Sequence, residues 1–215
     1  MTGAALWDLD GTLVDSADYH WESWVETLSP EGMSITYERF LETFGQRNDS
    51  ILPLWLGAGA TPERIARIGD DKEACYRRLV KEERLRALPG GAEWVRRLHE
   101  EGWRQAIASS APRLNIEVML EALGLARYFQ AIVAAEDVER GKPDPQVFLL
   151  AADLLGVPPS RAIVVEDAAA GIEAARRAGM RSIGVSRNGT PLAADIAVSS
   201  LADLPPGAFD DLLAR

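Results

Sequence analysis

The stretch AALWDLDGT, residues 4–12, decides how this chain is organised. Its first four residues are apolar and predict a strand, after which Asp8 and Asp10 point to one face and Gly11 permits a sharp turn. Two carboxylates this close repel each other, which favours a divalent cation or a shared proton. Ligands bind at the carboxyl ends of strands in open parallel sheets, so this is a candidate reactive position. A turn rich in Asp and Gly after an edge strand is the alternative interpretation.

Length, charge and cysteine content narrow the class of protein. With 215 residues the chain is long enough for one good core and a small second unit. Its formal net charge of −10 disfavours partners such as nucleic acid or an anionic membrane. Cys75 is the only cysteine, which excludes an internal disulfide, and we expect it to be a buried apolar residue. Without a signal peptide or a membrane-length apolar run, we expect a cytoplasmic protein, and a monomer, although the sequence does not identify the oligomeric state.

Hydrophobic periodicity divides the chain into two kinds of sequence. Between residues 16 and 88 the apolar spacing is helical, with one stripe at Trp21, Trp24, Val25 and Leu28 and a second at Tyr37, Phe40, Leu41 and Phe44. From residue 89 onward, β-rich runs at 105–108, 131–134, 162–165 and 182–185 alternate with helical segments at 92–100, 113–123 and 144–155. Such alternation predicts a parallel sheet with helices on both faces.

The sequence therefore predicts an α/β fold, a Rossmann-like parallel sheet with a small all-helical insert after the first strand. Residues 1–14 and 88–215 are expected to form the α/β core, and residues 15–87 the insert. The expected hinges are residues 13–16 and 85–91, the second of which contains a Pro-Gly-Gly break. Within the insert, Thr61-Pro62 predicts a helix start.

Three further polar features follow expected strands. Ser109-Ser110 precedes a helix, where hydroxyls and free N–H groups can hold a phosphate oxygen, although a helix cap would look the same. Lys142 directly precedes Pro143 and an expected helix start at Asp144-Pro145, which places it on a constrained segment, and an exposed turn lysine is the alternative. Glu166-Asp167 ends an apolar strand, which is costly near a core unless a cation or solvent meets the acids. A solvated acidic helix start is the other possibility there.

Taken in order along the chain, these motifs resemble those of the haloacid dehalogenase superfamily of phosphotransferases. The resemblance covers nearly the whole chain and rests on the Asp8-x-Asp10-Gly-Thr motif, Ser109, Lys142 and the Glu-Asp pair. The helical insert looks like the family's helical cap, which places the chain among the phosphatases and β-phosphoglucomutase-like members. The carboxylate at residue 10 argues against the dehalogenase branch.

The resemblance implies a role for each of these residues. Asp8 would be the nucleophile that forms an aspartyl phosphate, and Asp10 the general acid and base. Ser109, Ser110 and Lys142 would hold the transferred phosphoryl group and the substrate. The implied cofactor is Mg²⁺, bound by Asp8, the backbone carbonyl of Asp10 and Asp167, with Glu166 acting through water.

Resemblance to β-phosphoglucomutase extends into the insert. There it implies that His20 relays cap opening to the acid/base aspartate, and that Arg47 and Lys72 bind a distal phosphate of the substrate. Solvated helix residues are the alternative for all three. Phe44 stands where the mutases carry a lysine, which weakens the mutase interpretation.

Three functions remain after this comparison. The favoured one is a Mg²⁺-dependent phosphohydrolase of a small phosphorylated metabolite, with a sugar phosphate as the expected substrate. The alternative is an isomerase of the β-phosphoglucomutase type, in which a sugar hydroxyl replaces water. A non-catalytic phosphate-binding protein on the same fold is disfavoured, because the full set of motif residues is present, namely Asp8, Asp10, Ser109, Lys142, Glu166 and Asp167.

Overall fold

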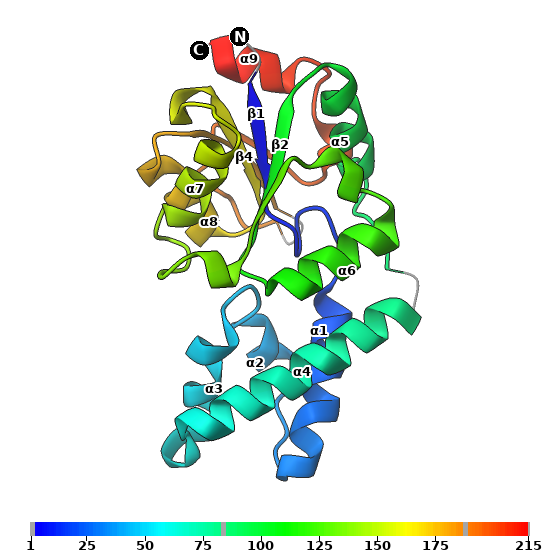
Figure 1. Ribbon diagram of the computed structural model, residues 1–215, viewed down its shortest axis with the longest axis vertical. Helices are drawn as coiled ribbons and strands as arrows, with labels where there is room; N and C mark the ends of the chain where they lie inside the picture. Colours follow the sequence, from blue (N-terminus) through cyan, green and yellow to red (C-terminus); the bar gives the residue numbers. More distant parts are fainter. Residues whose placement is uncertain (1–2, 83–84, 187–188, 215) are drawn as a thin grey trace.

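The fold is built on one six-stranded parallel sheet with the strand order β3-β2-β1-β4-β5-β6. The computed structural model describes residues 3–82, 85–186 and 189–214. Figure 1 shows β1 near the middle of the sheet, between β2 and β4. The strands are β1 (Ala4–Trp7), β2 (Arg104–Ala108), β3 (Ala131–Val133), β4 (Ala162–Glu166), β5 (Arg181–Val185) and β6 (Ile196–Val198).

Helices cover both faces of the sheet (Figure 1). On one face lie α5 (Gly91–Glu100), α6 (Arg113–Leu123) and α9 (Ala208–Ala214), and on the other lie α7 (Gln146–Leu154) and α8 (Ala169–Arg177). Side chains of β1 alternate between the two cores, with Ala5 and Trp7 in the first and Ala4 and Leu6 in the second. All four are fully buried, which explains why the strand is apolar throughout.

The helical insert that follows β1 lies beyond the carboxyl end of the sheet (Figure 1). It contains α1 (Ala17–Leu28), α2 (Tyr37–Leu41), α3 (Asn48–Leu56) and α4 (Pro62–Glu82). These helices enclose a small core of their own, made by Trp24, Leu28, Phe40, Ile51, Leu52, Trp55 and Ile68. The carboxyl half of α4 also packs against α6, so the insert rests on the α/β part of the chain.

The two segments that link the insert to the sheet run side by side. The backbone N–H of Leu88 donates to the carbonyl of Leu13 at 2.8 Å, and that of Asp15 donates to Arg86 at 3.2 Å. Both segments coincide with the hinges expected from the sequence. The insert therefore meets the sheet through a paired connection directly below β1.

The sequence prediction of the fold class is confirmed, with corrections in detail. The strand β6 was not predicted, and the predicted helix at 144–155 begins at Gln146. In the two apolar stripes, Val25 and Leu41 are 46% and 48% exposed, because each lies on the outer side of its short helix. Cys75 is half-buried and not in the core. None of the helices in the described parts of the chain is both long and apolar enough to cross a membrane.

We expect Leu6→Ala to lower the free energy of unfolding by about 2–5 kcal/mol, because it opens a cavity in the middle of the sheet. Leu6 has no exposed surface, whereas Leu154 on α7 is 57% exposed. Leu154→Ala is therefore the matched control and should change stability by less than about 0.5 kcal/mol. Urea denaturation measures both. Equal losses would contradict the assignment of Leu6 to the core.

Candidate active site

The predicted site residues meet at the carboxyl edge of the sheet. Asp8 follows β1, Ser109 follows β2, and Glu166 ends β4, so three neighbouring strands deliver them to one place. They line a cavity of about 930 Å³ between the sheet and the helical insert. Its lining also includes the other predicted site residues, namely Asp10, His20, Arg47, Lys72, Ser110, Lys142 and Asp167.

Lys142 joins two of the carboxylates. Its Nζ lies 2.6 Å from Oδ1 of Asp8 and 2.7 Å from Oε2 of Glu166, and its side chain is only 8% exposed. Burial opposes the charge of this lysine, but the two carboxylates outweigh it and raise the pKa of Lys142. The interpretation as an exposed turn lysine is therefore wrong. For Asp8, burial and repulsion by Glu166 raise the pKa to about 7 despite the ammonium group.

The acidic cluster fits a divalent cation. Carboxylate oxygens of Asp8, Glu166 and Asp167 lie within 4.8 Å of one another. Burial, together with repulsion by Asp8 and Glu166, raises the pKa of Asp167 to about 9. With Lys142 offsetting one charge, the three carboxylates leave an excess of two negative charges. A cluster of oxygen donors with this charge suits Mg²⁺.

Within the cluster, Glu166 is already occupied by other partners. Its Oε1 accepts from the backbone N–H groups of Asp167 and Ala168 at 3.2 and 3.1 Å, and its Oε2 accepts from Lys142.

Gly11 has φ of +81°, and a Cβ there would lie 2.1 Å from Oδ2 of Asp167. The glycine of the opening motif thus leaves room for the Asp167 carboxylate beside the turn.

Ser109 is buried, with 2% of its surface exposed. Its backbone N–H donates to Val133 at 3.0 Å and its Oγ accepts from the N–H of Ala111 at 3.1 Å. The helix α6 begins at Arg113, so Ser109 does not cap it. Ser109 and Ser110 both line the cavity, where their hydroxyls are placed for an anionic group.

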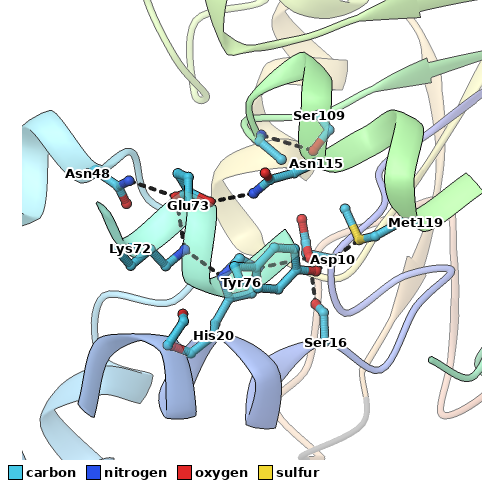
Figure 2. Close-up of polar contacts among 12 residues, drawn as sticks. Asp10, Ser16, His20, Asn48, Lys72, Glu73, Tyr76, Ser109, Asn115 and Met119 are labelled. Atoms are coloured by element: carbon cyan, nitrogen blue, oxygen red, sulfur yellow. Dashed lines mark hydrogen bonds and ion pairs between the residues drawn. The ribbon is translucent and has the colours of Figure 1, made fainter. Parts of the chain in front are cut away.

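Asp10 is turned toward the insert and is separate from the acidic cluster. Its Oδ1 accepts from Oγ of Ser16 at 2.5 Å and lies 3.2 Å from Nε2 of His20 (Figure 2). Burial favours the neutral acid, but the hydrogen bonds from His20 and Ser16 outweigh it and lower the pKa of Asp10. In this arrangement Asp10 is a carboxylate at neutral pH.

His20 and Lys72 form a pair next to Asp10. Nζ of Lys72 lies 2.7 Å from Nδ1 of His20, and because lysine only donates, Nδ1 accepts and Nε2 carries the proton toward Asp10. The side chains of His20 and Lys72 are 13% and 3% exposed, so the interpretation of both as solvated helix residues is wrong. Burial, followed by the charge of Lys72, lowers the pKa of His20.

Two more insert residues lie at the cavity wall. Arg47 donates from Nη1 to the carbonyl of Ala135 at 3.1 Å and pairs with Asp49 at 3.1 Å, so it links the insert to the sheet side of the cavity. Phe44 places its ring edge-on to His20, with centroids 5.8 Å apart. At residue 44, where the resemblance to the mutases would imply a lysine, the cavity wall carries an aromatic ring.

Sequence reasoning missed Ser16, Glu73 and Asn115. Ser16 stands six residues after Asp10, and its proximity to the motif was a usable signal. Glu73 follows Lys72 and accepts from it at 2.9 Å, but its second contact, with Asn115, comes from 42 residues away. The sequence contains no periodicity or spacing that pairs these two residues.

Comparison with known proteins identifies relatives that match most of the chain. β-Phosphoglucomutase of Bacillus subtilis (strain 168) is 32% identical over 212 residues, covering 94% of this chain and 91% of that protein. Fructose-1-phosphate phosphatase YqaB of Escherichia coli (strain K12) is 33% identical over 190 residues, covering 84% of this chain and 94% of that protein. The crystal structure of CbbY from Rhodobacter sphaeroides in complex with phosphate has a TM-score of 0.87 at 29% identity, covering 98% of this chain and 100% of that chain.

One relative is much longer than this chain. The chloroplastic protein SUPPRESSOR OF QUENCHING 1 of Arabidopsis thaliana is 36% identical over 191 residues, which are 85% of this chain and only 18% of the plant protein. The family described as haloacid dehalogenase-like hydrolase matches residues 5–185, from β1 to the end of β5. The matched range thus covers β1 to β5, the insert and every predicted site residue, and it ends before β6. The chain therefore belongs to the haloacid dehalogenase-like hydrolase family.

Proposed function

We propose that this protein is a Mg²⁺-dependent phosphatase of small sugar monophosphates that works through a phosphorylated Asp8. The observation that carries the proposal is the position of Asp8, which lies on the cavity wall against the ammonium group of Lys142, with Asp10 lining the same cavity. The names of relatives support the substrate class, since they include a fructose-1-phosphate phosphatase and a phosphorylated carbohydrates phosphatase.

The reaction proceeds in two displacements. An oxygen of Asp8 attacks phosphorus, the bond from phosphorus to the leaving oxygen breaks, and Asp10 gives that oxygen a proton. Asp10, now a carboxylate, takes a proton from water, which attacks the same phosphorus and releases phosphate from Asp8. A bound phosphate dianion raises the pKa of Asp10 by repulsion, which prepares it to act as an acid in the first step.

Mg²⁺ would be held by the carboxylates of Asp8 and Asp167 and the carbonyl of Asp10, with Glu166 acting through water, and it supplies positive charge to the phosphoryl oxygens. Lys142 favours the ionised form of Asp8 and binds a phosphoryl oxygen. Ser109 and Ser110 hold the others. We propose that residues 15–87 act as a cap, which keeps solvent from the cavity while Asp8 is attacked.

The cations of the cavity favour hydrolysis over mutase activity. Among the described residues that line it, each basic side chain has partners in the protein: Lys142 with Asp8, Lys72 with Glu73, Arg47 with Asp49 and Arg77 with Asn115. A mutase must hold a second phosphate with cationic groups while a bisphosphate turns around. The implied role of Lys72 as a distal-phosphate ligand therefore has little support, and a monophosphate fits better.

A Mg²⁺-dependent screen of phosphate esters tests this proposal. We expect phosphate release from several sugar monophosphates, including fructose 1-phosphate. With β-glucose 1-phosphate and a priming amount of the bisphosphate, we expect little glucose 6-phosphate. Rapid interconversion of the glucose phosphates without phosphate release would instead establish the isomerase alternative.

We expect Phe44→Lys to increase mutase activity relative to hydrolysis by about tenfold, since a charge-assisted hydrogen bond to a distal phosphate is worth one to two orders of magnitude in binding. Phe44→Leu is the matched control, because it removes the ring beside His20 without adding a charge. Coupled assays of glucose 6-phosphate and inorganic phosphate measure the ratio. The same change in both variants would show that the ring, and not the missing cation, controls the outcome.

A further inference from the structure

The carboxylate of Glu73 lies at the junction of the helical insert and the sheet. Its Oε1 accepts from Nζ of Lys72 at 2.9 Å and from Nδ2 of Asn48 at 2.7 Å, and its Oε2 accepts a short hydrogen bond from Nδ2 of Asn115. Figure 2 shows Glu73 between these groups, next to the Lys72–His20 pair. Lys72 and Asn48 belong to the insert, but Asn115 belongs to α6, beside the sheet.

The side-chain amide of Asn115 contacts α4 through both its oxygen and its nitrogen. Its Oδ1 accepts from Nη1 of Arg77 at 2.9 Å, while its Nδ2 donates to Glu73. Glu73 and Arg77 are four residues apart, so they lie on one face of α4. Because arginine only donates and a carboxylate only accepts, these neighbours determine the orientation of the amide. Asn115 has no exposed surface, so these contacts are made away from solvent.

The contacts form one chain of hydrogen bonds from α6 to Asp10. It runs from Asn115 through Glu73, Lys72 and His20 to the Asp10 carboxylate. Glu73 is 7% exposed, and a buried carboxylate that loses a partner is costly. The positions of Glu73 and of Lys72, which is paired with it, therefore depend on the packing of α4 against α6.

We propose that Glu73 and Asn115 are positioning residues, which align Lys72 and His20 with Asp10 when the insert is closed on the sheet. The inference rests on the proposed function, in which Asp10 gives a proton to the leaving group. When α4 leaves α6, the Asn115–Glu73 hydrogen bond breaks and the His20–Asp10 contact loses its support. Proton donation is thereby confined to the closed cavity.

Two substrates with different leaving groups test this. An alkyl ester such as fructose 1-phosphate needs a proton on its leaving oxygen, whereas p-nitrophenyl phosphate releases a stable anion without one. We expect Asn115→Ala to slow single-turnover release of fructose by about tenfold and release of p-nitrophenol by less than about threefold. Thermal unfolding is measured on the same preparations to show that the variant is folded.

Asn48→Ala is the matched control, because Asn48 donates to the same carboxylate from within the insert. We expect it to slow fructose release less than Asn115→Ala does, because the contact between α4 and α6 remains. Asn115→Asp should slow fructose release more than Asn115→Ala does, since it places a second carboxylate against Glu73. Adding Glu73→Gln to Asn115→Asp restores a donor and an acceptor across the junction, and it should recover at least about fivefold.

The outcomes separate the inference from the proposed function. Any one of four outcomes would overturn the positioning role. They are equal losses with both esters, no loss in Asn115→Ala, an Asn48→Ala effect as large as that of Asn115→Ala, and no recovery in the double variant. Release of no phosphate from any ester by the wild type in Mg²⁺ would instead reject the proposed function, and the inference would fall with it.

Discussion

Asp8→Asn is expected to lower the rate of phosphate release by about 10⁴-fold or more, the largest effect of any single substitution in this chain. An amide cannot attack phosphorus in place of the carboxylate. Asp8 contacts Lys142 from the end of β1, and no other carboxylate of the cluster lies at that position. Release of inorganic phosphate from the best ester of the screen, in excess Mg²⁺, measures the loss.

The same variant should remain folded. Lys142 keeps its contact with Glu166 at 2.7 Å, and the amide is nearly the same size as the carboxylate. Because the pKa of Asp8 is raised to about 7, ionised Asp8 costs stability in the metal-free protein above that pH, and an amide removes the cost. Metal-free Asp8→Asn should therefore unfold at or above the wild-type temperature at pH 8. Asp153→Asn, on the exposed side of α7, is the control for activity. Near-native turnover by Asp8→Asn would reject the mechanism.

Removal of the metal is expected to abolish activity, and added Mg²⁺ to restore it. The protein carries a net charge of −10 and must bind a phosphate dianion next to three carboxylates. Asp167→Ala should imitate chelation by raising the Mg²⁺ concentration needed for half-maximal rate, about tenfold or more. Phosphate release is measured across a Mg²⁺ titration for both proteins. Unchanged turnover in excess chelator would show that the cluster works without a metal.

The acidic cluster also makes the effect of Mg²⁺ on stability depend on pH. Burial and repulsion raise the pKa of Asp8 to about 7 and that of Asp167 to about 9, from an ordinary value of 3.8. The folded, metal-free protein therefore holds these protons more tightly than the unfolded chain does. The stability they contribute is complete below pH 4 and is lost as the pH rises through 7 and 9.

Mg²⁺ competes with these protons for the carboxylates, so it binds more tightly at high pH. We expect the increase in Tm on adding Mg²⁺ to be small at pH 5 and to grow toward pH 9. Calorimetry with and without chelator measures it. In Asp167→Ala the growth with pH should be reduced, because a carboxyl whose pKa is raised to about 9 is gone.

The α/β part of the chain and its candidate site residues could be predicted from the sequence, because their signals are local. A run of four apolar residues identifies β1, and the acids that follow identify its carboxyl end. In the same way, the apolar runs that precede Ser109 and Glu166 identify the carboxyl ends of β2 and β4. Once the strands are known to be parallel, these residues must meet at one edge of the sheet. The strand β6 escaped prediction because it has three residues and is only partly buried, which leaves no clear apolar run.

The helical character of the insert could be predicted from the sequence, but the partners of its polar residues could not. On a helix, a buried lysine and a solvated one have the same local sequence, and Lys72 is buried only because α4 packs against α1 and α6. Its partner Glu73 depends on Asn115, which another helix supplies.

The amino-acid sequence by itself determined the strands β1 to β5, the turn at Gly11 and the order of the acids and the lysine along the chain. Each of these follows from side-chain alternation, backbone freedom or residue type within a few positions. The tertiary structure alone decided that Asp10 turns toward His20, that Lys72 pairs with Glu73, and that Asn115 joins the insert to the sheet side. These contacts depend on how the helices of the insert pack against one another and against α6, and the burial that shifts the pKa values of these groups arises only from that packing.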